Sequence, residues 1–282
     1  MPSIRCNDCG NDIPQPASCC PHCGRWSQYW NVINAGEADE RTALKDRYDA
    51  AKANALARGA DAAVQDFETA VADSKAVIAR SIEEVQRLAR STHEIFGPYY
   101  LLIAAELKLP DGDEWDIVRQ LADTVLFPHH KEHIRFAALS LDGIGLSKYG
   151  GCSIQIRNDM IAHRASVIEE NSALFMERHG VKVARDPGMP KGYLAPWAER
   201  DKICTAKLAA RIDSTTTRNQ YSSLLLKQGA TSADDEFVEV HIWGPMTVLS
   251  IEKVTITDSK GASETRLNAL ISQLKKHGVT VA

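Results

Sequence analysis

The sequence predicts an α+β protein in three parts: a cysteine-rich segment at residues 1–30, a long helical hairpin at 31–110, and a mixed α+β domain with a small antiparallel sheet at 111–282. Three observations support this prediction. Paired cysteines occupy the first 24 residues, alanine-rich helical sequence follows them, and segments that alternate apolar and polar residues appear only in the second half. Helices and strands that are segregated along the chain are typical of α+β folds.

Composition and charge narrow the class of protein. The chain has 282 residues, of which 44% are hydrophobic and 25% charged, and this suits a globular protein with a substantial core. Its net charge is −4. The chain therefore does not belong to the many nucleic-acid-binding proteins that are basic throughout. A local basic face remains possible.

Cysteine usage and the apolar segments bear on the compartment. Five of the seven cysteines lie in the first 24 residues, so that Cys152 and Cys204 remain and no disulfide framework is expected. The N-terminus lacks the charged-then-apolar pattern of a secretory signal. The longest apolar stretch, at 99–105, is too short to span a bilayer. We therefore expect a cytoplasmic protein with no membrane partner.

Two Cys-x-x-Cys-Gly motifs open the chain, with Cys6 and Cys9 in the first and Cys20 and Cys23 in the second. Four thiolates on two tight turns can surround one Zn²⁺ tetrahedrally, and the glycine after each pair permits a positive φ that aims backbone amides at the sulfurs. The linking segment is too short for a core of its own, so a metal must supply much of the folding free energy. The alternatives are a disulfide or free thiols, and Cys19 is a spare thiol that could compete as a ligand.

Residues 4–25 resemble a zinc ribbon. The resemblance implies a structural Zn²⁺ held by Cys6, Cys9, Cys20 and Cys23. Zinc ribbons bind nucleic acid, bind protein or brace a fold, so this segment predicts a metal without predicting a function. The aromatic residues that follow it are expected to pack the ribbon onto the next element, with stacking on a nucleic-acid base as the alternative. They are Trp26, Tyr29 and Trp30.

Two helices are expected to form the hairpin. Residues 37–58, rich in Ala, Glu, Asp, Lys and Arg, predict the first helix, which Gly59 ends. Residues 60–96 predict a longer helix with a coiled-coil-like seam. The seam positions recur every seven residues, at Val64, Val71, Ile78 and Val85. The seam either packs against the first helix or forms a surface for a partner or a homodimer.

The second half mixes helical and strand-like segments. Helices are expected at 99–109, 113–127, 197–212 and 267–277. Strands are expected where apolar and polar residues alternate, at 134–142, 152–157, 237–243 and 248–257. The run at 237–243, Phe-Val-Glu-Val-His-Ile-Trp, alternates most regularly.

Arg157 is followed by Asn158 and, six positions after the arginine, by His163. This spacing resembles the signature of HEPN ribonucleases, whose domains are all-helical. The resemblance implies that His163 moves protons at the attacking or leaving oxygen and that Arg157 holds the scissile phosphate, without a metal. From the residues alone, the alternative is a solvated arginine and a histidine that caps or packs a helix.

Two further blocks share a longer pattern. The first runs from Tyr149-Gly-Gly through an alternating strand to Arg164-Ala-Ser and on to Ser172, and the second is Glu239-Val-His-Ile-Trp-Gly-Pro. In this order, over residues 134–257, they resemble a group of bacterial ADP-ribosyltransferase-like toxin domains. The resemblance implies an enzyme that uses NAD⁺ to modify a macromolecular target, either protein or nucleic acid, and that an inhibitor or antitoxin could restrain.

The resemblance also implies roles for four residues of these blocks. Glu239 would stabilise the oxocarbenium ion that forms when the nicotinamide–ribose bond breaks. Ser166 or Ser172 would position Glu239 or the ribose. His241 stands in place of the family's second acidic residue, and strand alternation puts it on the same face as Glu239. The alternative is a glutamate and a histidine on the solvated face of an amphipathic strand.

Three more residues would contact NAD⁺ under the same resemblance. Arg135 or Arg157 would bind the pyrophosphate, because a guanidinium pairs well with phosphate oxygens. Tyr149 would stack on the nicotinamide ring.

The sequence thus leaves three hypotheses: an ADP-ribosyltransferase-like toxin or defence effector whose zinc ribbon recognises the target or a partner, a HEPN-like ribonuclease, and a non-enzymatic zinc-ribbon binding protein. A sheet that contains 134–142, 152–157 and 237–243 favours the transferase, whereas helices on both sides of Arg157 favour the nuclease. We expect the transferase, because the pattern at 239–245 has no place in an all-helical fold.

Overall fold

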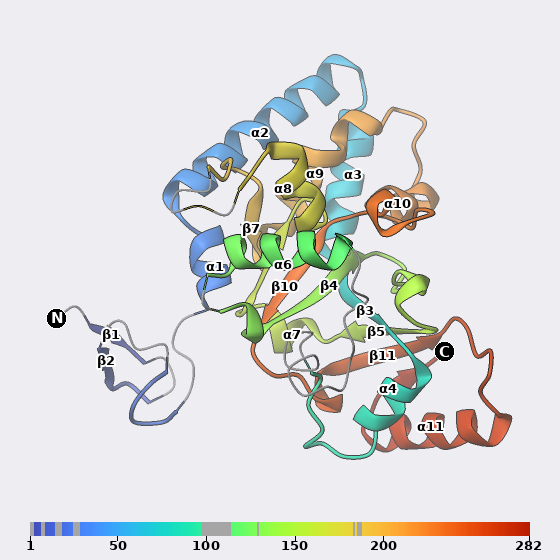
Figure 1. Cartoon of the computed structure of the whole chain (residues 1–282). Helices are drawn as coiled ribbons and strands as arrows, with labels where there is room; N and C mark the ends of the chain where they lie inside the picture. Colours follow the sequence, from blue (N-terminus) through green and yellow to red (C-terminus); the bar gives the residue numbers. More distant parts are fainter. Residues whose placement is uncertain are drawn as a thin grey trace.

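The computed structural model describes residues 3–6, 9–14, 19–24, 29–97, 114–128, 130–182, 184 and 188–282. Over these residues the chain is a mixed α+β protein with an eight-stranded, mostly antiparallel sheet (Figure 1). A cysteine cluster lies near its N-terminus. The predicted fold class is therefore confirmed.

The large sheet is assembled from strands that lie far apart in the sequence. From one edge to the other its order is β12 (Thr280–Val281), β11 (Ile251–Ile256), β5 (Cys152–Ile156), β3 (Lys75–Arg80), β4 (Ile134–Ser140), β10 (Glu239–Trp243), β6 (Ala165–Ile168) and β7 (Leu194–Pro196). The β11–β12 pair is parallel, and the other neighbours are antiparallel. Two small ladders accompany it, β1 (Ser3–Arg5) with β2 (Asp12–Pro14) and β8 (Leu226–Lys227) with β9 (Glu236–Phe237).

The predicted strands at 134–142, 152–157, 237–243 and 248–257 are confirmed as β4, β5, β9–β10 and β11. All five side chains of β10 are buried. Because successive side chains of a strand point to opposite faces, Val240 and Ile242 lie on one face of the sheet, and Glu239, His241 and Trp243 lie on the other. This alternation decides which residues can meet in a site.

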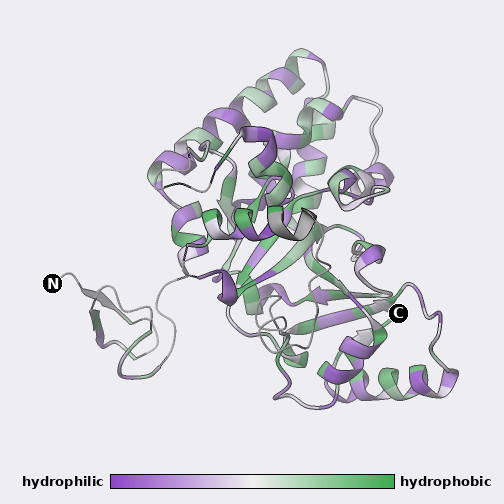
Figure 2. Cartoon of the chain, in the orientation of Figure 1, coloured by the Kyte–Doolittle hydropathy of each residue, from purple (hydrophilic) through white to green (hydrophobic). Residues whose placement is uncertain are grey.

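One face of the sheet carries the larger apolar core. Six helices, together with Ile161 of the short helix α7 (Asn158–Ile161), contribute side chains to one buried cluster with Val240 and Ile242. The helices are α2 (Ala38–Ala57), α3 (Asp61–Ala72), α4 (Ile82–Leu88), α9 (Arg200–Leu208), α10 (Arg218–Leu225) and α11 (Glu264–Lys276). Figure 2 shows the central strands largely in the hydrophobic colour and the helix α2 in mixed colours, as expected for a helix with one exposed side.

The opposite face is covered by α1 (Trp30–Ala35), α6 (Glu114–Leu126) and α8 (Ser172–His179), and α6 crosses in front of β10 and β4 in Figure 1. Ala122, Phe175 and Trp243 belong to the second apolar cluster there. The helix α7 (Asn158–Ile161) connects β5 to β6, and short 3₁₀ turns complete the described structure. They are Lys131–His133, Ser147–Tyr149, Trp197–Glu199, Ala209–Arg211, Ser232–Asp234 and Val248–Ser250.

The long second helix predicted over 60–96 is wrong. A helix ends at Ala72, the strand β3 follows, and a new helix begins after Ser81, which forms a capping box with Glu84. The inner residues of β3 are buried on both faces of the sheet, so this strand shows no alternation of apolar and polar residues. The sevenfold spacing of apolar residues thus runs across three separate elements, α3, β3 and α4, and does not mark one continuous helix. The seam residues Val64, Val71, Ile78 and Val85 are all core residues.

The first helix of the hairpin and its turn are confirmed. α2 spans Ala38–Ala57, and Gly59 adopts a φ of 69° between it and α3. The predicted helix at 113–127 is confirmed as α6, in which Ala122 is buried and Leu121 is exposed. The predicted helix at 99–109 lies outside the described residues.

The predicted C-terminal helices are also present. The prediction at 197–212 corresponds to α9 with a 3₁₀ turn at each end, and the prediction at 267–277 corresponds to α11. Among the helices within the described ranges, none combines the length and the apolarity needed to cross a bilayer.

Candidate functional site

The four predicted cysteine ligands lie together. The sulfur atoms of Cys6, Cys9, Cys20 and Cys23 all lie within 4.8 Å of one another. The Sγ atoms of Cys6 and Cys23 are 3.7 Å apart, and those of Cys9 and Cys20 are 3.5 Å apart. A tetrahedron with metal–sulfur bonds of about 2.3 Å has edges of about 3.8 Å, so this spacing fits a tetrahedral ion. The four cysteines are therefore positioned to hold a metal ion, compatible with a zinc ribbon.

The turn geometry explains why the sulfurs converge. The N–H of Gly10 donates to the carbonyl of Cys6, and the N–H of Gly24 donates to the carbonyl of Cys20. Both glycines have φ near 70°, a conformation that residues with a side chain seldom adopt. Backbone and side-chain N–H groups of Asn11 lower the pKa of Cys9 to about 6, which favours the thiolate that a metal requires.

A buried cluster of polar side chains lies on the face of the sheet beneath α6. β10 pairs with β6, and Ser166 stands directly opposite His241. The Nε2 of His241 lies 2.9 Å from Oε1 of Glu239, and both side chains are almost completely enclosed. The predicted placement of Glu239 and His241 on one face thus corresponds to direct contact.

The cluster includes an arginine that was not expected from the sequence. Arg119 extends from α6, and its Nη2 lies 3.3 Å from Oε2 of Glu239. Its guanidinium stacks over the ring of Phe136 at 4.3 Å and lies within 3.8 Å of Asp123. The side chain of Arg119 is 20% exposed, whereas that of Glu239 is 2% exposed. Arg119 therefore separates the carboxylate from solvent.

Opposing effects act on the charge of Glu239. Burial raises the pKa of its carboxyl, but the positive charge of Arg119 and the contacts with His241 and Ser172 outweigh burial, so that the pKa lies below its ordinary value. Glu239 is therefore a carboxylate at neutral pH. Ser172, at the start of α8, is fully buried beside it, although its hydroxyl makes no hydrogen bond of regular geometry.

A second unexpected residue braces the same strands. The side-chain amide of Asn31, in α1, donates to Oγ of Ser166 at 3.2 Å, to the carbonyl of His241 at 3.0 Å and to the carbonyl of Arg164 at 3.2 Å. Asn31 is buried. It thus connects the helix that follows the ribbon to both strands of the polar cluster.

Arg135 does not join this cluster. It pairs with Ile242 in the β4–β10 register, which puts its side chain on the opposite face of the sheet from Glu239. Its guanidinium donates to the carbonyls of His133 and Phe96, and burial lowers its pKa to about 10. These contacts are those of a structural arginine.

Arg157, His163 and Tyr149 are also placed elsewhere. Arg157 caps α7 and donates to the carbonyl of Ile251. The strand β5 precedes it, where the ribonuclease resemblance expects a helix. His163 is exposed and packs edge-on against Tyr29. Tyr149 is 44% exposed, and its hydroxyl lies 3.4 Å from Oγ of Ser232.

A group of acidic residues lies just after β6. Ligand atoms of Glu169, Glu170 and His179 lie within 4.8 Å of one another. Arg47 pairs with Glu169 at 2.5 Å and Arg178 pairs with Glu170 at 2.9 Å. Each carboxylate thus already has an arginine partner, and a positive charge beside it disfavours a metal ion.

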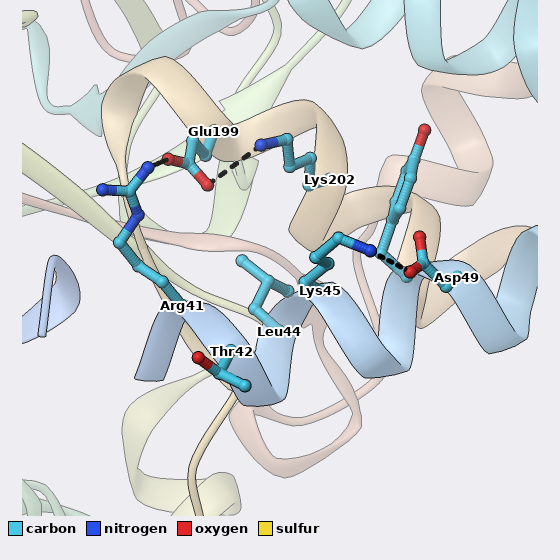
Figure 3. A pocket seen from close by; sticks show the side chains of 8 residues that line it. Arg41, Thr42, Leu44, Lys45, Asp49, Glu199 and Lys202 are labelled. Atoms are coloured by element: carbon cyan, nitrogen blue, oxygen red, sulfur yellow. Dashed lines mark hydrogen bonds and ion pairs between the residues drawn. The ribbon is translucent and has the colours of Figure 1, made fainter. Parts of the chain in front are cut away.

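An open pocket lies over α2 and α9 (Figure 3). Glu199 accepts from Arg41 at 3.0 Å and from Lys202 at 3.2 Å, and Lys45 pairs with Asp49. Figure 3 shows these side chains directed toward one another. None of the residues predicted for function lines this pocket.

Comparison with known proteins assigns no family. No protein-family model matches the chain. No curated protein matches it either.

Proposed function

We propose that this chain is an ADP-ribosyltransferase-like toxin or defence effector, in which the sheet provides the NAD⁺ site and a zinc ribbon recognises the macromolecular target or a partner. The observation that carries the proposal is the contact between Glu239 and His241 on β10, opposite Ser166 on β6. These are the residues to which the resemblance at 134–257 assigns catalysis.

The chemistry suits an ionised, enclosed carboxylate. Cleavage breaks the bond between ribose C1′ and the nicotinamide nitrogen, and nicotinamide leaves with the bonding electron pair. A nucleophile of the target then bonds to C1′ and loses its proton. Glu239 accepts a hydrogen bond from a ribose hydroxyl and stabilises the positive charge that develops on the sugar. His241 holds Glu239 in place through the 2.9 Å contact.

In this proposal, Arg119 binds the pyrophosphate of NAD⁺. Arg135 is on the other face and Arg157 is engaged at the end of β5, whereas Arg119 contacts Glu239 and is partly exposed. Entry of NAD⁺ offers its guanidinium a diphosphate in exchange for the carboxylate. That exchange uncovers Glu239, so substrate binding and opening of the site are one step.

The metal of the ribbon is proposed to be zinc, because four thiolates at tetrahedral spacing suit its preferences. A cytoplasmic location agrees with the seven free cysteines of the chain, since a reducing compartment keeps thiols free.

One observation favours a second candidate, a non-enzymatic zinc-ribbon binding protein. Glu239 is enclosed and paired with both Arg119 and His241, and a purely structural ion pair has the same appearance. In that case the cluster stabilises the sheet and the ribbon alone carries the function.

The test is transfer of label from NAD⁺ to cell lysate. We expect the wild-type protein to label protein or nucleic acid, and Glu239→Gln to lose the transfer while it keeps a folded thermal transition. Glu252→Gln, on β11 and half exposed, is the matched control and should transfer normally. If the wild type neither transfers label nor consumes NAD⁺, the binding-protein candidate replaces the transferase.

A further inference from the structure

We infer that Asn31 is a positioning residue that directs the hydroxyl of Ser166 toward the bound nucleotide. This inference rests on the proposed NAD⁺ site and adds a residue to it. Asn31 was assigned no role from the sequence, because its partners lie 133, 135 and 210 positions away along the chain.

The inference begins with the direction of one hydrogen bond. The Nδ2 group of Asn31 is a donor only, so Oγ of Ser166 must be the acceptor in the 3.2 Å bond between them. The hydroxyl hydrogen of Ser166 then remains for a different acceptor. Ser166 is 1% exposed, and within the described residues Oγ of Ser166, as it stands, has no acceptor at hydrogen-bond distance for that hydrogen. A buried donor of this kind is expected to find a partner.

The position of Ser166 indicates what that partner is. Ser166 stands opposite His241 on the face that carries Glu239. Glu239 is its diagonal neighbour, at the spacing of about 7–8 Å typical of such pairs. A sugar ring bound to Glu239 would therefore bring another of its oxygens toward Ser166. We assign the ligand of this hydroxyl as an oxygen of the nucleotide that contains the reacting ribose.

Asn31 is suited to hold this geometry rigid. Its amide also bonds to the carbonyls of Arg164 and His241, so it is fixed to both strands at once. The side chain is 3% exposed and water does not compete for it. A rigid donor behind Ser166 prevents its hydroxyl from rotating toward those carbonyls. The hydroxyl therefore stays available to the substrate.

The experiment is a double-mutant cycle on NAD⁺ cleavage with the full-length zinc-loaded protein. Asn31→Ala and Ser166→Ala should each raise KM for NAD⁺ about tenfold and leave kcat nearly unchanged, the effect of one hydrogen bond made to bound substrate. The double variant should be no worse than Ser166→Ala alone, because Asn31 acts through that hydroxyl. Asn34→Ala, the same residue type in the same helix, is the control and should match the wild type.

The outcomes separate the inference from the proposed function. If the losses of the two single variants multiply in the double variant, or if kcat alone falls, then Asn31 only braces the fold. Either result would overturn the inference. If Asn31→Ala does not fold, the milder Asn31→Ser is used in the same cycle. A wild-type protein that does not cleave NAD⁺ would overturn the proposed function, and the inference with it.

Discussion

At the scale of single residues, the buried ionisable groups of this chain fall into two kinds. The charge of Glu239 is compensated, because Arg119 and His241 lower the pKa of its carboxyl in spite of burial. Glu170 is not fully compensated, because burial outweighs the charges of Arg178 and Lys207 and raises its pKa. One of its oxygens has no hydrogen-bond partner in the described structure. These two carboxylates therefore affect stability in opposite directions as the pH changes.

Replacement of Glu170 should stabilise the protein at neutral pH. Its pKa is raised on folding, so the folded state binds the proton more tightly, and stability falls as the pH rises above the ordinary glutamate value of about 4.3. Glutamine resembles the neutral, protonated glutamate, so Glu170→Gln should raise the free energy of unfolding at pH 7 by roughly 1 kcal/mol. Urea unfolding measures this, with the exposed Glu177→Gln on the following helix α8 as control. A gain that persists unchanged at pH 4 would contradict the explanation.

At the scale of elements, one carboxylate fastens α2 to the segment that leads into β7. Oε1 of Glu40 accepts the backbone N–H groups of Gly192, Tyr193 and Leu194 at 2.8–2.9 Å. Gly192 has a φ of 87°, and a Cβ there would lie 2.7 Å from the backbone of Ala43. The segment can approach α2 this closely only because residue 192 is glycine.

Removal of the Glu40 carboxylate should lower the free energy of unfolding by more than a surface substitution does. Glu40→Ala leaves three backbone donors without a partner, so we expect a loss of about 2–4 kcal/mol in the free energy of unfolding. Amide hydrogen exchange at 192–194 should become faster. The control is Glu37→Ala, whose exposed carboxylate pairs with Lys191 and whose loss should change stability little. Unaltered exchange at 192–194 would show that Glu40 does not hold the segment.

The elements also show how far the sequence can be interpreted. β4, β5 and β10 were predictable because polar residues alternate with apolar ones in them, and the same alternation placed Glu239 beside His241. β3 was not predictable from periodicity, because it is buried on both faces. Arg119 and Asn31 were missed because each acts on a strand distant in sequence, a pairing that no local pattern records.

At the scale of the whole molecule, the ribbon and the sheet depend on different forces. Within the described part of the ribbon the apolar cluster consists of Cys6, Ile13 and Cys20, whereas the sheet is surrounded by two large clusters. A core with a single aliphatic side chain cannot offset the entropy of ordering its chain. We therefore expect the ribbon to need a metal ion in order to fold, whereas the sheet does not.

Removal of the metal should unfold the ribbon alone. A strong chelator should release one zinc per chain and abolish the protection of amides near Cys6 and Cys20, while the main thermal transition of the sheet shifts by only a few degrees. Cys20→Ser should reproduce the effect, and the buried Cys204→Ser should leave zinc binding intact. Loss of the main transition on chelation would mean that the metal supports the whole fold.

If Glu239 serves catalysis on NAD⁺, as we propose, the release of nicotinamide should depend on its carboxylate. Purified wild-type protein, incubated with NAD⁺ and lysate, should release nicotinamide and transfer label to macromolecules. Glu239→Gln should reduce both by at least a hundredfold, since loss of one group that stabilises transition-state charge costs about that much. Equal activity in the wild type and Glu239→Gln, or no activity in either, would contradict the account.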